Sequence, residues 1–152
     1  VVTLESAGAG QALAPVVVEA AATARTRHPE FTARLAERTG KRTTFVTREQ
    51  IERRKPPTVS ALLMTVPGVL VLHDDRGRPV VRTSSGEGLS LLARCASMLV
   101  FLDGVQAPPG ATLDLVDWRD LEGIEVYRNG ADVPPRYNVP GAACGVILLW
   151  TR

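Results

Sequence analysis

Two short helical patterns follow each other within residues 47–66, and each carries its own start signal. Thr47 followed by Gln50 is a capping-box pattern. In a capping box the threonine hydroxyl accepts the backbone N–H of the glutamine, and the glutamine side chain accepts the backbone N–H of the threonine. Prolines 56 and 57 end this helix, because proline lacks the amide N–H that a continuing helix needs. The pattern predicts a helix that starts at Arg48.

The second pattern, VSALLMTV, follows Thr58, which is a suitable N-cap residue. The spacing of its large apolar residues predicts one buried stripe on a helix. Pro67 and Gly68 interrupt the pattern and predict its end. The residues of the stripe are Val59, Leu62, Leu63 and Val66.

Strand-like runs dominate the rest of the chain, and Gly, Pro, Asp or Asn residues bound each of them. Because helices come early and strands late, we expect an α+β fold with a small mixed β-sheet and short helices, rather than a regular parallel α/β fold. The predicted strands are residues 69–72, 79–83, 98–103, 124–128 and 146–151.

The N-terminal region differs in composition from the rest of the chain. Residues 1–28 are rich in small side chains, and we expect them to be a tail or linker, with residues 29–152 forming the domain. Within the tail, the run PVVVEA at residues 15–20 is an isolated β-branched segment between small-residue flanks. A further short helix is predicted from Pro29, with Gly40 as its stop.

The charge distribution is uneven although the net charge is only +2. Residues 25–55 hold ten basic and four acidic residues, whereas residues 103–152 hold seven acidic and four basic ones. The basic stretch has only two aromatic residues, Phe31 and Phe45, and no Gly-rich phosphate loop, so we do not expect nucleic-acid binding. No apolar run is long enough for a transmembrane helix. The absence of a signal-peptide pattern leaves a cytoplasmic protein and a processed exported one both open.

The acidic residues of the C-terminal half raise the question of catalysis. Alternation in IEVYR places Glu125 and Tyr127 on one face of a strand, and no calcium-loop spacing is present. We interpret these acids as helix caps and solvated strand edges. An enzyme would instead need Asp103, Asp114 or Glu125 to converge on another titrating group in one cleft. Since nucleophile-elbow, zinc-protease and phosphate-loop motifs are also absent, we expect no enzyme, no metal and no cofactor.

Cys95 and Cys144 are the only cysteines. Each stands just before an apolar strand-like run, so pairing of those two strands would bring the sulfur atoms together. A disulfide and a pair of buried thiols are both compatible with the sequence.

Four motifs in order resemble the plug domain of TonB-dependent outer-membrane receptors. TREQIERRKPPTVSALLMTVPGVLV (residues 47–71) resembles the helical segment and its PGV turn, and MLVFLDGV (residues 98–105) resembles the strand that ends in DGV. DLEGIEVYRNGADVPPRYN (residues 120–138) resembles the I-E-V-x-R-G-P segment, with Asn129–Gly130 in place of Gly-Pro. GAACGVILLWTR (residues 141–152) resembles the closing strand.

The resemblance implies a non-catalytic gate of an outer-membrane uptake receptor, located in the outer membrane or periplasm of a Gram-negative bacterium. It implies two partners: a TonB-like energy-transducing protein and an outer-membrane β-barrel, on this or another chain. A TonB box would be the segment that binds the first partner by strand addition. An ordinary first strand or linker is the alternative for that segment. Its residues are Pro15, Val16, Val17, Val18, Glu19 and Ala20.

The sequence leaves two points open. A free-standing periplasmic binding or adaptor module with a plug fold is the alternative function, and residues 1–5 fit the end of a carboxypeptidase-regulatory-like domain of the kind that precedes some plugs. The cargo-binding residues are unknown, and residues 84–89 and 106–112 are where we would look for them.

Overall fold

The computed structural model describes residues 27–37, 43–84, 95–108, 111 and 113–152. It divides the chain into two compact units, residues 1–36 and 37–152. Helix α2, Pro29–Glu37, lies almost wholly in the first unit and begins at the predicted residue. An ion pair of 3.6 Å joins Glu30 to Arg34 one turn later. The predicted stop, Gly40, is outside the described residues.

Helix α3, Arg48–Arg54, begins where the capping box predicts. Thr47 donates its backbone N–H to Gln50 Oε1 at 2.9 Å, and Gln50 returns a backbone N–H to the Thr47 hydroxyl at 3.4 Å. Lys55 closes the helix in the left-handed conformation, with φ of 44°. The predicted start and stop are therefore both correct.

Helix α4, Val59–Leu63, is capped by the Thr58 hydroxyl, which accepts the Ala61 N–H at 3.1 Å. The helix is shorter than predicted and gives way to turns at Met64. The predicted apolar stripe is nevertheless correct, because all of its members are at most 4% exposed. They are Val59, Leu62, Leu63 and Val66.

The main sheet has five strands in the order β1-β6-β7-β4-β5. Among the described strands of this sheet, only the β4–β7 pair is parallel, which makes the sheet mixed, as predicted. β1 was not predicted, and β6 starts three residues before its predicted start. The strands are β1 Thr44–Thr47, β4 Leu99–Leu102, β5 Val105–Gln106, β6 Leu121–Tyr127 and β7 Val146–Thr151.

The remaining two strands, β2 (Val69–His73) and β3 (Pro79–Thr83), form a separate antiparallel hairpin. At its tip, the Arg78 backbone N–H donates to Asp74 Oδ1 at 2.9 Å. This bond, together with the Arg78 guanidinium 2.8 Å from Asp74 Oδ2, holds the pKa of Asp74 below its usual value.

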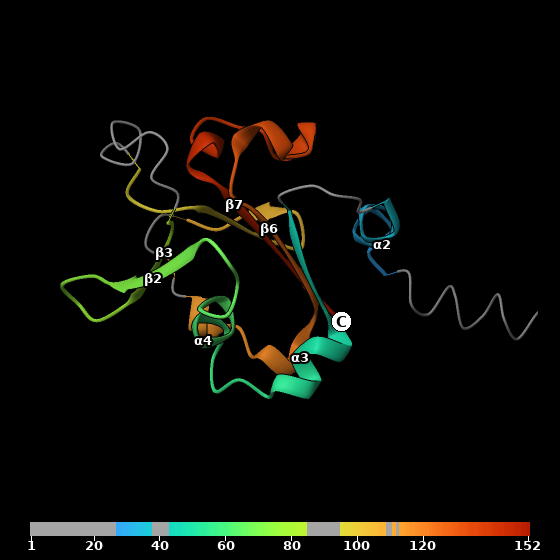
Figure 1. The fold of residues 1–152 in the computed structure, drawn as a ribbon, viewed down its shortest axis with the longest axis horizontal. Coiled ribbons are helices and arrows are strands. Elements are labelled where there is room, and N and C mark those ends of the chain that lie inside the picture. The colour runs from blue at the N-terminus through green and yellow to red at the C-terminus, as the bar shows by residue number, and fades with distance from the viewer. Residues whose placement is uncertain (1–26, 38–42, 85–94, 109–110, 112) are drawn as a thin grey trace, which may run out of the picture. The chain divides into compact units, whose positions relative to one another are not determined.

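The five-stranded sheet is covered on both faces (Figure 1). On one face, Ile124, Ile147 and Leu149 pack in a core that includes Ile51 of α3 and Leu62 of α4. The segment after β6 covers the other face with three 3-10 turns. These turns are η4 Gly130–Asp132, η5 Pro135–Tyr137 and η6 Ala142–Cys144, and two more, η2 Leu113–Leu115 and η3 Trp118–Asp120, precede β6.

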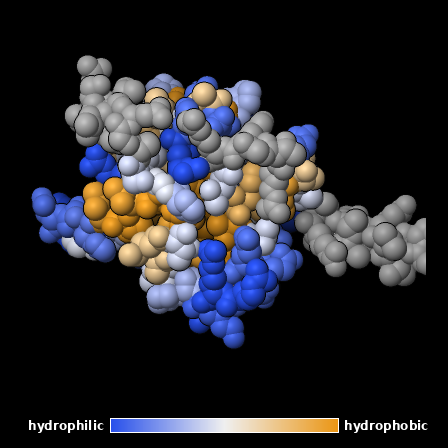
Figure 2. Space-filling view, in the orientation of Figure 1, coloured by the Kyte–Doolittle hydropathy of each residue, from blue (hydrophilic) through white to orange (hydrophobic). Residues whose placement is uncertain are grey.

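Figure 2 shows separate hydrophobic and hydrophilic regions on this side of the surface. Hydrophobic residues gather over the β2–β3 hairpin, where Leu70 and Leu72 are each 45% exposed. Hydrophilic residues cover the hairpin tip and α3. Within the described ranges, no helix is both long and apolar enough to cross a membrane.

Candidate functional site

Glu125 lies on β6 and is fully buried. Its Oε2 accepts from the Trp150 indole N–H at 2.7 Å, and its Oε1 accepts from the Tyr127 hydroxyl at 2.5 Å. The interpretation of this residue as a solvated strand-edge acid is therefore wrong. Alternation along β6 correctly placed Glu125 and Tyr127 on one face, but the sequence did not reveal that this face is covered.

The cover over Glu125 is aromatic. The Tyr137 ring from η5 lies 5.0 Å from the Phe101 ring and 6.5 Å from the Trp150 ring, both edge to face. The Arg136 guanidinium stands 5.4 Å from the centre of the Tyr137 ring. Tyr127 and Trp150 both lie on the sheet, so the hydrogen bonds that they donate to Glu125 tie β6 to β7 under this cover.

Three other acids each fasten a different element, and Asp117 among them is a helix cap, as predicted. Asp103 accepts from the Thr151 backbone and hydroxyl at 2.8 and 2.6 Å, which fastens the end of β7. Asp114 accepts from the Ser60 backbone and hydroxyl at 2.9 and 2.8 Å, which fastens α4. Asp117 caps η3, and the Arg119 backbone N–H lowers its pKa.

These acids do not form the convergent cleft that an enzyme would need, because their partners lie on separate elements. The part of the chain that the structure describes also contains no cluster of three or more His, Cys, Asp or Glu residues suited to a metal ion. The arrangement is that of a domain whose acids hold its own elements together.

Arg128 lies across Gly68, the glycine of the PGV turn. A Cβ atom on Gly68 would come within 2.5 Å of Arg128 Nη1, and the backbone there has φ of +77°. Glycine is required at this position both by conformation and by close approach. Two of the four motifs of the resemblance, residues 47–71 and 120–138, meet at this contact.

Arg48 connects the start of α3 to the start of β6. Its Nη1 donates to the backbone oxygens of Arg119 and Leu121, each at 2.7 Å. The sequence predicted that Arg48 lies in the first turn of the helix, but it did not predict these hydrogen bonds. It ties the helical layer to the sheet.

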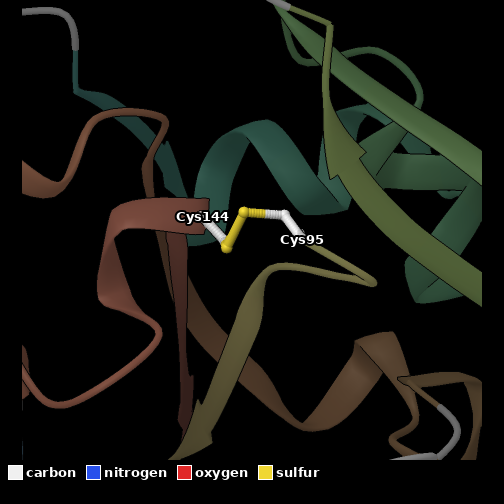
Figure 3. The surroundings of a disulfide bond; sticks show 2 residues. All are labelled: Cys95 and Cys144. Atoms are coloured by element: carbon white, nitrogen blue, oxygen red, sulfur yellow. A yellow bond between two sulfur atoms is a disulfide. The ribbon is translucent and has the colours of Figure 1, made fainter. Parts of the chain in front are cut away.

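Cys95 and Cys144 form a disulfide, with Cα atoms 5.5 Å apart (Figure 3). The alternative of two buried thiols is therefore not what the structure contains. The bridge agrees with the pairing of the strands that come after the cysteines, since Leu99 of β4 lies opposite Val146 of β7.

The predicted binding segments are only partly within the described residues. Pro15, Val16, Val17, Val18, Glu19 and Ala20 lie outside them, as do residues 85–89. Of residues 106–112, Gln106, Ala107, Pro108 and Ala111 line an apolar cavity of about 450 Å³ beside β4 and β5. Cargo binding at this cavity stays a prediction.

The domain has a mixed sheet with short helices, and its acids bond to its own elements. Residues 36–142 match the family model of the TonB-dependent Receptor Plug Domain. The chain belongs to this family, which confirms the resemblance seen in the sequence. No curated protein sequence matches the chain.

Solved structures of siderophore receptors share the fold. A variant of the ferric enterobactin receptor PfeA from Pseudomonas aeruginosa has 23% identity and a TM-score of 0.57, over 75% of this chain and 18% of that one. The siderophore receptor PirA from the same organism has 26% identity and a TM-score of 0.50, over 76% and 19%. The alcaligin receptor FauA from Bordetella pertussis has 19% identity and a TM-score of 0.52, over 75% and 18%. The chain therefore spans under a fifth of the length of these receptors.

Proposed function

We propose that this chain is the gate of an outer-membrane uptake receptor in a Gram-negative envelope. The observation that carries the proposal is the family match over residues 36–142. The likeness to plug regions of siderophore receptors agrees with it at the level of the fold. Residues 1–28 would be the tail that reaches a partner, and residues 29–152 the plug-like domain.

The gate role needs a domain that keeps its structure inside a water-lined β-barrel. The hydrogen bonds that its acids make to its own side chains and backbone support this role. A barrel, on this or another chain, would surround the plug. Cargo would be a small molecule taken up by that barrel.

The energy-transducing partner would be a TonB-like protein that binds residues 15–20. The segment is apolar and β-branched with one carboxylate, a composition that suits addition to the edge of a partner's sheet. In such addition, backbone hydrogen bonds supply affinity and alternate side chains supply selectivity. Movement of the plug would follow from tension on this segment.

The test is a calorimetric titration of the C-terminal domain of the TonB-like protein from the same organism against the full chain and against the chain without residues 1–20. We expect binding by the full chain and its loss on truncation. Val17→Pro removes a backbone donor within the segment and should also abolish binding, because strand addition needs that N–H. Val2→Pro is the matched control outside the segment and should bind like the full chain.

Two results would change the assignment. Equal binding with and without residues 1–20 would place the partner site on the folded domain. Absence of binding in both would favour the alternative of a free-standing periplasmic binding or adaptor module, and would redirect the search to other envelope proteins.

A further inference from the structure

The disulfide joins the chain where two neighbouring strands begin. Cys95 precedes β4 and Cys144 precedes β7, and these strands run parallel. Leu99, the first residue of β4, donates its backbone N–H to Gly145 at 3.0 Å, directly after the bridge. The bridge therefore fastens β4 and β7 at their common starting end (Figure 3).

We propose that this bridge is a mechanical stop, which limits how much of the domain unfolds when the chain is pulled from its N-terminal side. The inference rests on the proposed function, since it needs a partner that pulls on residues 15–20. Tension from that side reaches Cys95 first and crosses the bridge to Cys144. It bypasses residues 96–143, which contain β4, β5, β6 and the buried Glu125.

The part of the domain ahead of the bridge is held by contacts that can break one after another. It comprises the elements within residues 44–83, and among the described residues β1 at its start is an edge strand that pairs only with β6. Arg48 ties α3 to the backbone at Leu121, and Ser60 ties α4 to Asp114. All of these ties are non-covalent, so a pull can remove them in sequence from the β1 end.

The part behind the bridge resists a pull in a different way. β7 lies between β6 and β4 and is hydrogen-bonded to both. Tension between Cys144 and Arg152 acts along β7 and must shear two ladders together, whereas peeling β1 breaks a single ladder from one end. Asp103 additionally holds the far end of β7 at Thr151. The structure thus orders the two events: the elements ahead of the bridge detach first.

Force spectroscopy of the full chain, held by tags at its two ends, tests the proposal. Under oxidising conditions we expect a first event that releases residues 44–95, a contour gain of roughly 180 Å at about 3.6 Å per residue. The bridged remainder should stay folded until a higher force. Adding a phosphine reductant should then extend the final length by roughly 170 Å, because residues 96–143 enter the path of the force.

The order of the unfolding events is what tests the proposal. Any disulfide excludes the residues of its loop from the measured extension, so the change in length on reduction is not enough by itself. Release of all accessible length in one event by the oxidised chain would overturn the proposal. So would an intermediate that persists unchanged in size and force after reduction. Cys95→Ser/Cys144→Ser serves as a control that should not respond to reductant; if it does not fold, reduction of the wild-type chain during the measurement still decides. The measurement needs no partner, so its failure is distinguishable from failure of the titration.

Discussion

Trp150 of β7 donates its indole N–H to the carboxyl oxygen of Glu125 on the neighbouring strand β6 at 2.7 Å, and both side chains are excluded from solvent. Tyr127 supplies the second donor, from the same strand as Glu125. Both oxygens of the carboxyl group are therefore engaged by buried donors. Glu125 is therefore a buried polar link between β6 and β7.

Replacing Glu125 tests that role. Glu125→Ala leaves two buried donors unsatisfied and should lower the free energy of unfolding by about 3–5 kcal/mol. Glu125→Gln keeps one acceptor at nearly the same volume and should cost less, about 1–2 kcal/mol. Urea denaturation measures both. Equal losses, or a loss below 1 kcal/mol for the alanine variant, would contradict the role assigned to the hydrogen bonds.

The contact between Gly68 and Arg128 has a matched control at the hairpin tip. Gly68 and Gly77 have nearly equal positive φ values, +77° and +74°, but a Cβ at Gly77 meets nothing within 4 Å. Gly77→Ala should therefore cost only the conformational strain, about 1–2 kcal/mol. Gly68→Ala should cost about 1–3 kcal/mol more, because Arg128 must move. The double variant Gly68→Ala/Arg128→Ala should recover part of this excess in thermal unfolding.

The α4 stripe gives a second matched pair. Leu62 is 1% exposed and Met64, two residues later, is 64% exposed. Leu62→Ala should lower the free energy of unfolding by about 2–5 kcal/mol, since it leaves a cavity in the core. Met64→Ala should change it by less than about 0.5 kcal/mol. Similar losses in the two variants would mean that α4 does not pack as described.

The hairpin tip should respond to acid. Hydrogen bonds from Arg78 favour the ionised form of Asp74, so the pKa of this carboxyl in the folded state lies below its ordinary value of 3.8. A group with a lowered pKa stabilises the fold above the unfolded value, and that contribution disappears as pH falls through the folded value. An NMR titration of the Asp74 carboxyl should show a midpoint below 3.8. A midpoint at or above that value would contradict the geometry of the tip.

Local signals in the sequence predicted the helical layer well, because caps and breakers act over three or four residues. Thr47, Gln50 and Thr58 set the helix starts without help from the rest of the chain. β7 was also predicted at its observed bounds, since its apolar run is enclosed by Gly145 and Arg152.

Other features depended on contacts that local patterns do not encode. β1 is only four residues long, with two threonines, and exists because β6 offers it an edge. Glu125 looked solvated because its cover, including Tyr137, comes from a segment of 3-10 turns with no hydrophobic period. Strand alternation gives the face of a residue but not what lies over that face.

Reduction should weaken the domain measurably. The bridge spans 49 residues, and removing it frees the unfolded chain to adopt more conformations. Reductant should lower the free energy of unfolding by about 2–4 kcal/mol in chemical denaturation. An unchanged transition midpoint, with complete reduction verified by thiol titration, would show that the bridge does not stabilise the domain.

The central proposal is that a TonB-like partner binds residues 15–20 of this gate domain. Its most direct test is an NMR titration of the ¹⁵N-labelled full chain with the C-terminal domain of that partner. The account predicts that the largest changes in backbone signals fall on residues 15–20, while the signals of the five-stranded sheet stay in place in the absence of tension. Changes concentrated on the sheet, the β2–β3 hairpin or the cavity beside β4 would contradict it, because the partner would then be bound by the folded domain.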